Sequence, residues 1–458
     1  MKNWVVIIAF VLVALSGCSQ RHPSEPLPNQ PPETFLALMP DGALRRTVSQ
    51  QSIHWWGVDP DGFVAGYFFS LDSVHWTYTT RTDSFFTFRL NRLDTTYSFF
   101  VAAIDNEGSR DPNPASLRYP IQNSPPGVSY LLTSTVPETT YTVATFQWLG
   151  TDIDGNETIV NYYYALDDTS NPARWKKLPG DANLVTLFKS DGLTEGNHAF
   201  YLKAQDVAGT FSPTVRMPDT GKVWYVREPK GNFLIVRDYL PSDFSAAFYK
   251  QIFDTLMGGK LGSRDIIDIK KGASAISRGK FVPPLINPTF TETLKLFKYV
   301  FWYGDNAPSL DIIQASLPGF KKAGGKVLLV AGFPQNISAQ GGLGDFAPID
   351  NIESSFFTTI LLPRDSVVAV DPTYPTLVRD TLGFIYTFPR GILPKIDARV
   401  LYKMQASPRW AGQPIMGVKD ADRPTFVLIA TLLHRYGTPP NRVAALLRKV
   451  YQDEFGVQ

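Results

Sequence analysis

Six aspartates at matching positions of two similar segments could bind a hard cation. Each segment carries an Asp-x-Asp-Gly turn and a further aspartate in a later loop: Asp59, Asp61, Asp105, Asp152, Asp154 and Asp206. Carboxylate oxygens are preferred ligands of Ca²⁺, so calcium is a candidate cofactor, and no other is expected. An aspartate before glycine is also ordinary turn chemistry, in which its side chain accepts a backbone N–H. Because the sequence holds no complete calcium-binding loop, the turn interpretation is favoured.

Three further polar residues follow apolar runs in the second half of the chain. Asp238 and Asp305 each close such a run, and His434 comes after a third. If the runs are parallel strands, these residues lie at the edge where open α/β sheets bind ligands. Together with aromatic residues such as Phe333 they could hold a sugar or a peptide. The alternative, which is favoured, is that the aspartates only cap turns and that His434 is a packing or surface histidine.

Motifs for metal, phosphate or nucleophilic chemistry are absent from the sequence. There is no H-E-x-x-H, no C-x-x-C, no phosphate loop, no G-x-G-x-x-G after a predicted strand and no G-x-S-x-G where a nucleophile turn would stand. The net charge is +2 without a basic patch, which argues against a nucleic-acid partner. These absences favour a binding or structural role over an enzyme. A hydrolase is the alternative, since two unidentified carboxylates facing one cleft could perform general acid–base chemistry.

Cys18 is the only cysteine of the chain, and it follows an apolar N-terminal stretch. Lys2 supplies a positive charge, and the uncharged run from Trp4 to Leu15 is short for a membrane span but suits a signal peptide. The tetrapeptide Leu15-Ser16-Gly17-Cys18 resembles the lipobox of bacterial lipoproteins. This resemblance implies cleavage before Cys18 and acylation of its thiol and amine, which together attach a protein stably to a membrane. An ordinary secretory signal and a short membrane anchor are the alternatives.

The residues around Cys18 predict where the protein is held. Residues 1–17 form the expected signal peptide, and residues 18–32 form a proline-rich tether that stays extended and buries no core. Position 19 is serine rather than aspartate, so retention in an inner membrane is not indicated. The resemblance therefore implies a lipid-anchored protein of the cell envelope, with the outer membrane as the expected location.

One pattern occurs twice in the first half of the chain. Both copies read Trp-x-Gly-x-Asp-x-Asp-Gly, starting at Trp55 and at Trp148, and both continue into an alternating strand and a second tryptophan. Short alternating strands broken by Asp-Gly turns predict an antiparallel sandwich, and the repetition strengthens the prediction. The copies resemble fibronectin type III and related immunoglobulin-like modules of bacterial surface proteins. We expect two such domains, at 33–123 and 124–220, with both tryptophans in their cores.

The composition changes near Pro229, where apolar runs begin to alternate with helical periodicity. This alternation predicts strand–helix–strand units. The expected strands are 232–238, 265–269, 299–305, 326–331 and 425–430. Helices are expected after residues 241–243, after Ser309, where Pro318 would bend or shorten the helix, and after Thr438.

The order of these elements resembles the class I glutamine amidotransferase-like fold, and more narrowly its non-catalytic versions beside immunoglobulin-like modules in secreted bacterial proteins. The resemblance implies an α/β flavodoxin-like parallel-sheet domain over 229–458, in which residues 335–396 cannot be placed. The catalytic family has a cysteine on the turn after the fourth strand, but residues 331–335 hold no cysteine. His434 would be a relic of the catalytic histidine, and no catalytic residue is carried over.

The sequence therefore predicts a multidomain protein of two immunoglobulin-like sandwiches and one α/β domain. The protein would be anchored to a membrane through Cys18, and the sandwiches would act as a stalk. The α/β domain would present a non-catalytic surface to an envelope protein or a glycan. The ligand and the oligomeric state are left open.

Overall fold

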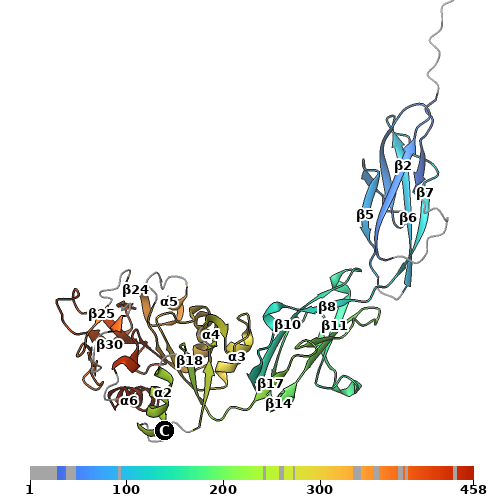
Figure 1. The fold of residues 1–458 in the computed structure, drawn as a ribbon. Helices are drawn as coiled ribbons and strands as arrows, with labels where there is room; N and C mark the ends of the chain where they lie inside the picture. Colours follow the sequence, from blue (N-terminus) through green and yellow to red (C-terminus); the bar gives the residue numbers. More distant parts are fainter. Residues whose placement is uncertain are drawn as a thin grey trace, which may run out of the picture. The chain divides into compact units, whose positions relative to one another are not determined.

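The computed structural model describes most of the chain beyond the expected tether (Figure 1). The described residues are 28–37, 48–90, 94–240, 244–256, 263–271, 274–333, 342–353, 360–379, 385–386, 390–436 and 441–457. Cys18 and the expected signal peptide lie outside them. Within the described residues, no helix is both long enough and apolar enough to cross a membrane.

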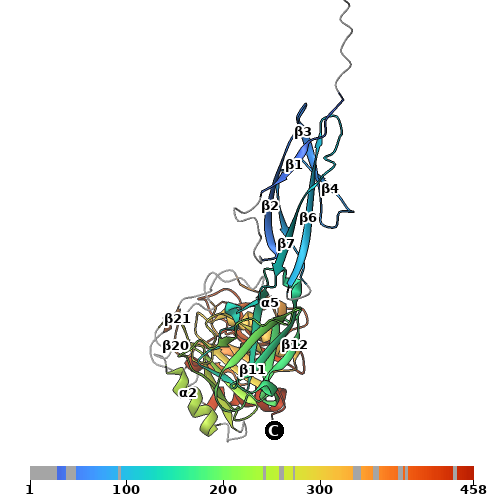
Figure 2. The same cartoon turned by 90° about the vertical axis from the view of Figure 1, so that its right-hand side faces the viewer.

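The chain forms two compact units. The first contains residues 1–125 with the loops 152–158 and 207–210, and the second contains residues 126–151, 159–206 and 211–458. The first unit is built on a β-sandwich, whose strands are drawn in Figure 2. One sheet has the order β1 (Glu33–Leu36), β2 (Gln50–Val58), β5 (Asp83–Thr87), and the other β4 (Thr77–Thr79), β3 (Val64–Ser70), β6 (Asp94–Asp105), β7 (Ala115–Gln122).

Aromatic residues fill the core of this first sandwich, as the alternating strands predict. Trp55 is 1% exposed and packs edge-on against Tyr67 and obliquely against Phe99. The hydroxyl of Tyr97, near the start of β6, donates to the backbone carbonyl of Arg89. Such a tyrosine corner is a feature of immunoglobulin-like sandwiches. The prediction of a sandwich with Trp55 in its core is therefore confirmed.

The second sandwich has three small sheets. Their orders are β13 (Leu184–Phe188), β10 (Val143–Thr151), β8 (Gly127–Tyr130); β12 (Lys176–Pro179), β11 (Ile159–Leu166), β15 (Phe200–Asp206), β16 (Val215–Met217); and β14 (Gly196–His198), β17 (Trp224–Arg227), β9 (Thr139–Tyr141). Single 3₁₀ turns are η1 (Leu132–Ser134), η2 (Asn156–Thr158), η3 (Pro172–Arg174) and η4 (Lys189–Asp191). Trp148 is 1% exposed, as expected, and Phe146 stacks on Phe200 with 3.9 Å between ring centroids.

The C-terminal part is built on a mixed sheet. Among the described residues its order is β19 (Arg264–Asp268), β18 (Phe233–Asp238), β22 (Tyr299–Gly304), β23 (Lys326–Val330), β32 (Phe426–Ile429), β31 (Ile415–Lys419), β30 (Arg399–Met404), β26 (Ser366–Ala369), β27 (Leu377–Val378). The first five strands are parallel, and β31, β30, β26 and β27 extend the sheet with antiparallel pairs. The expected flavodoxin-like parallel sheet is thus corrected to a mixed one.

Helices and short hairpins complete this part. The helices are α2 (Ser245–Gln251) with a π-helical continuation (Ile252–Leu256), α3 (Pro288–Lys295), α4 (Leu310–Lys322), α5 (Leu343–Phe346), η6 (Leu433–Tyr436) and α6 (Asn441–Arg448) with a π-helical end (Lys449–Glu454). Two-stranded pairs are β20 (Lys270–Lys271) with β21 (Ser274–Arg278), β24 (Ile349–Ile352) with β29 (Ile392–Pro394), and β25 (Ile360–Leu361) with β28 (Ile385–Tyr386). Helix α4 continues four residues past Pro318, so proline does not shorten it there.

The second sandwich has a hydrophobic core of its own, but its Tyr141 is buried in the core of the C-terminal part. Tyr141, at the end of β9, is fully buried, stacks on Phe281 at 5.1 Å and meets Phe297 edge-on at 5.3 Å. The N–H of Thr145 in β10 donates to the hydroxyl of Thr289 in α3 at 2.9 Å. These contacts explain why residues on both sides of the expected boundary near 220–229 belong to one compact unit.

Candidate functional site

The two aspartates predicted at strand ends lie close together, but they point into the fold. Asp238, the last residue of β18, is fully buried. Its carboxylate accepts hydrogen bonds from the backbone N–H and the hydroxyl of Ser309 at 2.6 and 2.8 Å, and from the indole N–H of Trp302 at 3.4 Å. Asp238 therefore holds Ser309, the residue that precedes helix α4. This role is similar to the turn-capping role that was the favoured alternative.

Lys270 joins Asp238 and Asp305, a role that no sequence motif indicates. Its ammonium donates to both carboxylate oxygens of Asp305 at 2.9 Å and to the carbonyl of Ala307 at 2.8 Å, and lies 3.5 Å from a carboxylate oxygen of Asp238. Burial raises the pKa of Asp238 to about 6, although Lys270 and Ser309 act to lower it. One ammonium thus binds both carboxylates, an arrangement that holds three strand ends together.

His434 lies in an aromatic cluster. Its side chain is in η6 and is 3% exposed. Its ring meets Tyr239 edge-on at 5.2 Å and Phe244 edge-on at 5.1 Å, and further aromatic contacts come from α2. This environment corresponds to the packing interpretation of the residue.

In the first sandwich, the aspartates of the calcium hypothesis bind the segment that precedes the domain. Asp61 accepts the backbone N–H of Gln30 at 3.0 Å, and Asp105 accepts the amide of Asn29 at 2.7 Å and the backbone N–H of Ser109 at 2.8 Å. Asp59 accepts the N–H of Asp61 at 3.4 Å, as in an Asp-Gly turn.

The second sandwich repeats this arrangement. Asp154 accepts the backbone N–H of Ser124 at 2.7 Å, and Asp152 accepts the N–H of Asp154 and the hydroxyl of Thr158 at 2.8 and 2.9 Å. Asp206 is buried at the end of β15. An Asn-x-Pro-Pro segment precedes each sandwich, at residues 29–32 and 123–126. Its double proline is the only feature of the sequence that marks the segment bound by these aspartates. Within the described residues, no group of three His, Cys, Asp or Glu side chains could hold a metal ion.

These contacts predict how the protein responds to calcium. We expect the melting temperature of the full-length protein to be the same in EDTA and in millimolar CaCl₂, because the carboxylates bind N–H groups of the preceding segment. Scanning calorimetry in the two buffers is the measurement. A specific site at a hundred times its dissociation constant would add about 2.7 kcal/mol, so a clear upward shift in calcium would restore the calcium hypothesis.

A cleft opens at the carboxyl ends of β18 and β19, beside Asp238 and Asp305. Its volume is about 730 Å³, which lies within the range of small-molecule sites. Successive side chains of a strand point to opposite faces. Arg237 and Tyr239 therefore line the cleft, whereas Asp238 between them points to α4. Tyr303 of β22 also lines the cleft, and its ring centroid lies 6.4 Å from that of Tyr239.

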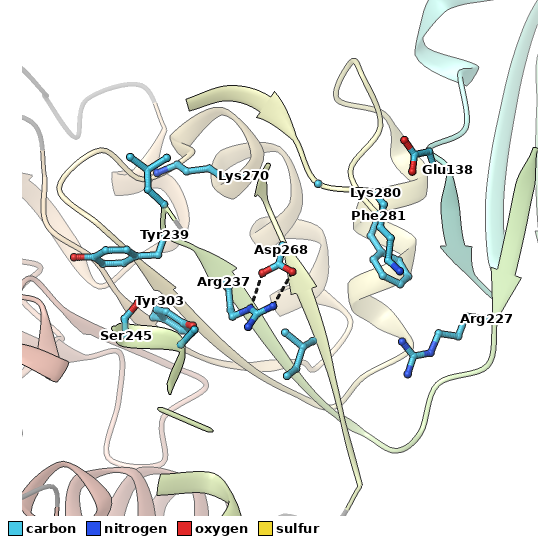
Figure 3. A pocket seen from close by; sticks show the side chains of 14 residues that line it. Glu138, Arg227, Arg237, Tyr239, Ser245, Asp268, Lys270, Lys280, Phe281 and Tyr303 are labelled. Atoms are coloured by element: carbon cyan, nitrogen blue, oxygen red, sulfur yellow. Dashed lines mark hydrogen bonds and ion pairs between the residues drawn. The ribbon is translucent and has the colours of Figure 1, made fainter. Parts of the chain in front are cut away.

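A paired arginine and aspartate occupy the middle of the cleft (Figure 3). Arg237 and Asp268 are register neighbours on β18 and β19. The guanidinium donates through Nε and Nη2 to the two carboxylate oxygens at 2.5 and 2.7 Å. Such a fork is a strong and geometrically specific pair. Because both side chains are partly exposed, the fork keeps donor and acceptor positions open to a ligand.

The second sandwich supplies part of the opposite wall. Figure 3 shows Glu138 and Arg227 on this side, with Lys280 and Phe281 next to them. Arg227 lies 3.6 Å from the carboxylate of the buried Asp265, and Lys280 lies over the ring of Phe281 at 5.4 Å. Four cationic side chains among the described residues line the cleft: Arg227, Arg237, Lys270 and Lys280. The first three each have a carboxylate within 4 Å, so the protein itself largely balances the charge of the cleft.

This arrangement suits binding through hydrogen bonds and ring contacts. The sequence predicted a possible ligand site at this edge of the sheet through Asp238 and Asp305, but both carboxylates bind Lys270, and Asp238 also binds Ser309. Arg237, Tyr239 and Asp268 line the cleft but were not named, and their only sequence signal is their position at the ends of two predicted strands.

No family model and no curated protein matches the sequence. Solved structures do match it. The fibronectin(III)-like modules of Clostridium thermocellum CbhA are 14% identical, with 43% of this chain and 95% of that chain covered and a TM-score of 0.19. A two-module fibronectin type III segment of chicken tenascin is 14% identical, with 40% and 95% covered and a TM-score of 0.23. Carbohydrate-binding modules of the β-sandwich superfamily are 13% identical, with 38% and 59% covered and a TM-score of 0.18. The neighbours of this chain thus include fibronectin III-like and other β-sandwich modules.

Proposed function

We propose that this chain is a binding protein of the cell envelope and that its cleft beside β18 and β19 binds a glycan. The observation that carries the proposal is the Arg237–Asp268 fork beside Tyr239 in a cleft of about 730 Å³. Each sugar hydroxyl both donates and accepts hydrogen bonds, and a paired guanidinium and carboxylate offer both functions at fixed positions. The ring of Tyr239, which is partly exposed, offers apolar surface to the face of a sugar ring.

The charge distribution favours a neutral glycan over a polyanion. A polyanion site collects cations that have no carboxylates beside them, but Arg227, Arg237 and Lys270 each have one within 4 Å. Holding the cations in this way also preorganises them, which reduces the entropy that a ligand must overcome. A hydrolase is less well supported, because Asp238 and Asp305 bind one ammonium instead of facing the cleft as an acid–base pair.

The remaining parts of the proposal concern anchoring and ancestry. The lipobox-like Leu15–Cys18 supports a lipid anchor at Cys18 in the outer membrane, with residues 18–32 as tether and the sandwiches as stalk. The parallel strands, numbered along the chain, follow the order 2-1-3-4-5, which is that of flavodoxin-like folds. This order supports a distant, non-catalytic relative of the amidotransferase-like fold, to which the antiparallel strands are an addition.

The Arg237→Ala variant tests the proposed site. On an array of neutral and acidic glycans, we expect the wild-type full-length protein to retain at least one neutral glycan. The variant should bind that glycan about 10- to 100-fold more weakly, since a hydrogen bond to a charged group contributes roughly 1.5–3 kcal/mol. Isothermal titration with the retained glycan measures the loss.

Arg399→Ala is the matched control, because Arg399 forms an exposed ion pair with Asp422 and does not line the cleft. This control should bind as the wild type does. Retention of only acidic glycans, or of no glycan, would overturn the proposal, and so would equal binding by Arg237→Ala and wild type.

A further inference from the structure

A second cavity adjoins the cleft along the same strands. Its volume is about 230 Å³. Four residues line both cavities: Arg237, Ala246, Ile266 and Tyr303. Because the two volumes share these walls, they are neighbouring parts of one groove.

The groove follows the direction of the strands. On β19, Arg264, Ile266 and Asp268 alternate along one face, and on β18 Ile235 and Arg237 do the same. The parallel register places Ile235 beside Ile266 and Arg237 beside Asp268. From Arg264 to Asp268 the strand advances about 13 Å at 3.3 Å per residue, which is longer than a single sugar ring.

The chemistry of the second cavity continues that of the first. Ile235, Ile266, Ala246 and Ala247 give it apolar walls. Its cations are again paired within the protein, because Lys250 and Arg264 both bind the carboxylate of Asp254. A chain of neutral sugar rings finds the same kind of surface on both sides of the Arg237–Asp268 fork.

We infer that the groove binds a linear neutral oligosaccharide along β18 and β19, with Arg237 near its middle and the second cavity as an additional subsite. This inference rests on the proposed function and deepens it. It predicts that affinity increases with chain length, because a disaccharide fills only part of the groove.

Ala247 allows the second cavity to be blocked alone. It lines that cavity and not the first, and it is exposed on α2, so a large side chain fits there without entering the core. Ala247→Trp should fill the second cavity. Gln251→Trp is the matched control, because Gln251 is exposed on the same helix and lines neither cavity.

The experiment is calorimetric titration of the full-length protein with ladders of linear oligosaccharides, from disaccharide to octasaccharide. The neutral ladders are β-1,4-glucan, β-1,3-glucan, α-1,4-glucan and β-1,4-mannan, and a polyuronate ladder is the acidic comparison. For at least one neutral ladder, wild-type affinity should increase with length. Ala247→Trp should lower the affinity for the longest member about tenfold, or about 1.4 kcal/mol. It should leave the disaccharide affinity unchanged, which also shows that the variant is folded, and Gln251→Trp should match wild type throughout.

The outcomes separate this inference from the function on which it rests. If a neutral disaccharide binds as tightly as the octasaccharide, or if Ala247→Trp matches wild type while Arg237→Ala loses binding, the additional subsite is wrong and the glycan site stands. If none of the neutral ladders binds, or if the polyuronate ladder binds more tightly, both are overturned.

Discussion

Replacing Tyr141 with alanine is expected to lower the free energy of unfolding of the second compact unit by about 3–5 kcal/mol, the usual cost of truncating a buried aromatic residue. Tyr141 belongs by sequence to a sandwich strand, yet its ring is fully buried against Phe281 and Phe297 of the C-terminal part. The substitution therefore leaves a cavity in the core that joins the two parts. Urea denaturation followed by tryptophan fluorescence measures the loss.

Tyr225→Ala is the matched control. Tyr225 is on β17, the strand paired with β9, but it is 38% exposed and its hydroxyl contacts the exposed Glu195. We expect this control to cost less than about 1 kcal/mol. A loss of similar size in both variants would show that Tyr141 does not join the two parts. The same contacts imply that residues 229–458 alone lack a core side chain and fold less stably than 126–458.

Much of the fold was predictable, because its strands and repeats follow strong local patterns. The five expected C-terminal strands match β18, β19, β22, β23 and β32. Four of them are short apolar runs that are buried on both faces, whereas β19 at the edge of the sheet alternates between buried and exposed residues. The two sandwiches were predictable because Trp55 and Trp148 begin the same pattern.

The antiparallel half of the mixed sheet was not predictable in this way. β30 carries the charged Lys403 among its apolar residues, and β31 contains Gly417 and ends at Lys419, so neither is a uniform apolar run. The burial of Tyr141 in the C-terminal core was missed for a related reason. Tyr141 ends the three-residue strand β9, which is too short to show a pattern, and nothing local indicates that its ring packs on Phe281.

The residues that line the cleft were only partly predictable. The sequence indicated where the strands end, but not which side chains at those ends face the cleft. In a strand buried on both sides, Arg237, Asp238 and Tyr239 are equally plausible as ligand-facing residues from sequence alone. In the structure, Asp238 binds Ser309, whereas Arg237 and Tyr239 line the cleft. Lys270 allows Asp238 to be buried, because its ammonium lies beside the carboxylate. Lys270 comes from a segment that no sequence motif marks.

Asp238→Ala should therefore be strongly destabilising. The substitution removes the acceptor of the Ser309 N–H and hydroxyl and of the Trp302 indole, and it removes one of the two carboxylates beside Lys270. We expect a loss of about 3 kcal/mol, the lower end of the range for breaking a buried ion pair, because Lys270 keeps Asp305. Chemical denaturation measures it. Asp422→Ala is the control, since its pair with Arg399 is exposed and should contribute less than about 1 kcal/mol.

The pH dependence of stability distinguishes a titrating Asp238 from a merely hydrogen-bonded one. Burial raises its pKa from 3.8 to about 6. Between these values the folded protein holds a proton that the unfolded chain has released, so this group stabilises fully below about pH 4 and loses that contribution as the pH rises through 6. Asp238→Asn cannot titrate. The unfolding free energy of wild type minus that of Asp238→Asn should therefore fall between pH 5 and pH 7. A difference that stays flat between pH 5 and pH 7 would mean that Lys270 outweighs burial and keeps the carboxylate charged at both pH values.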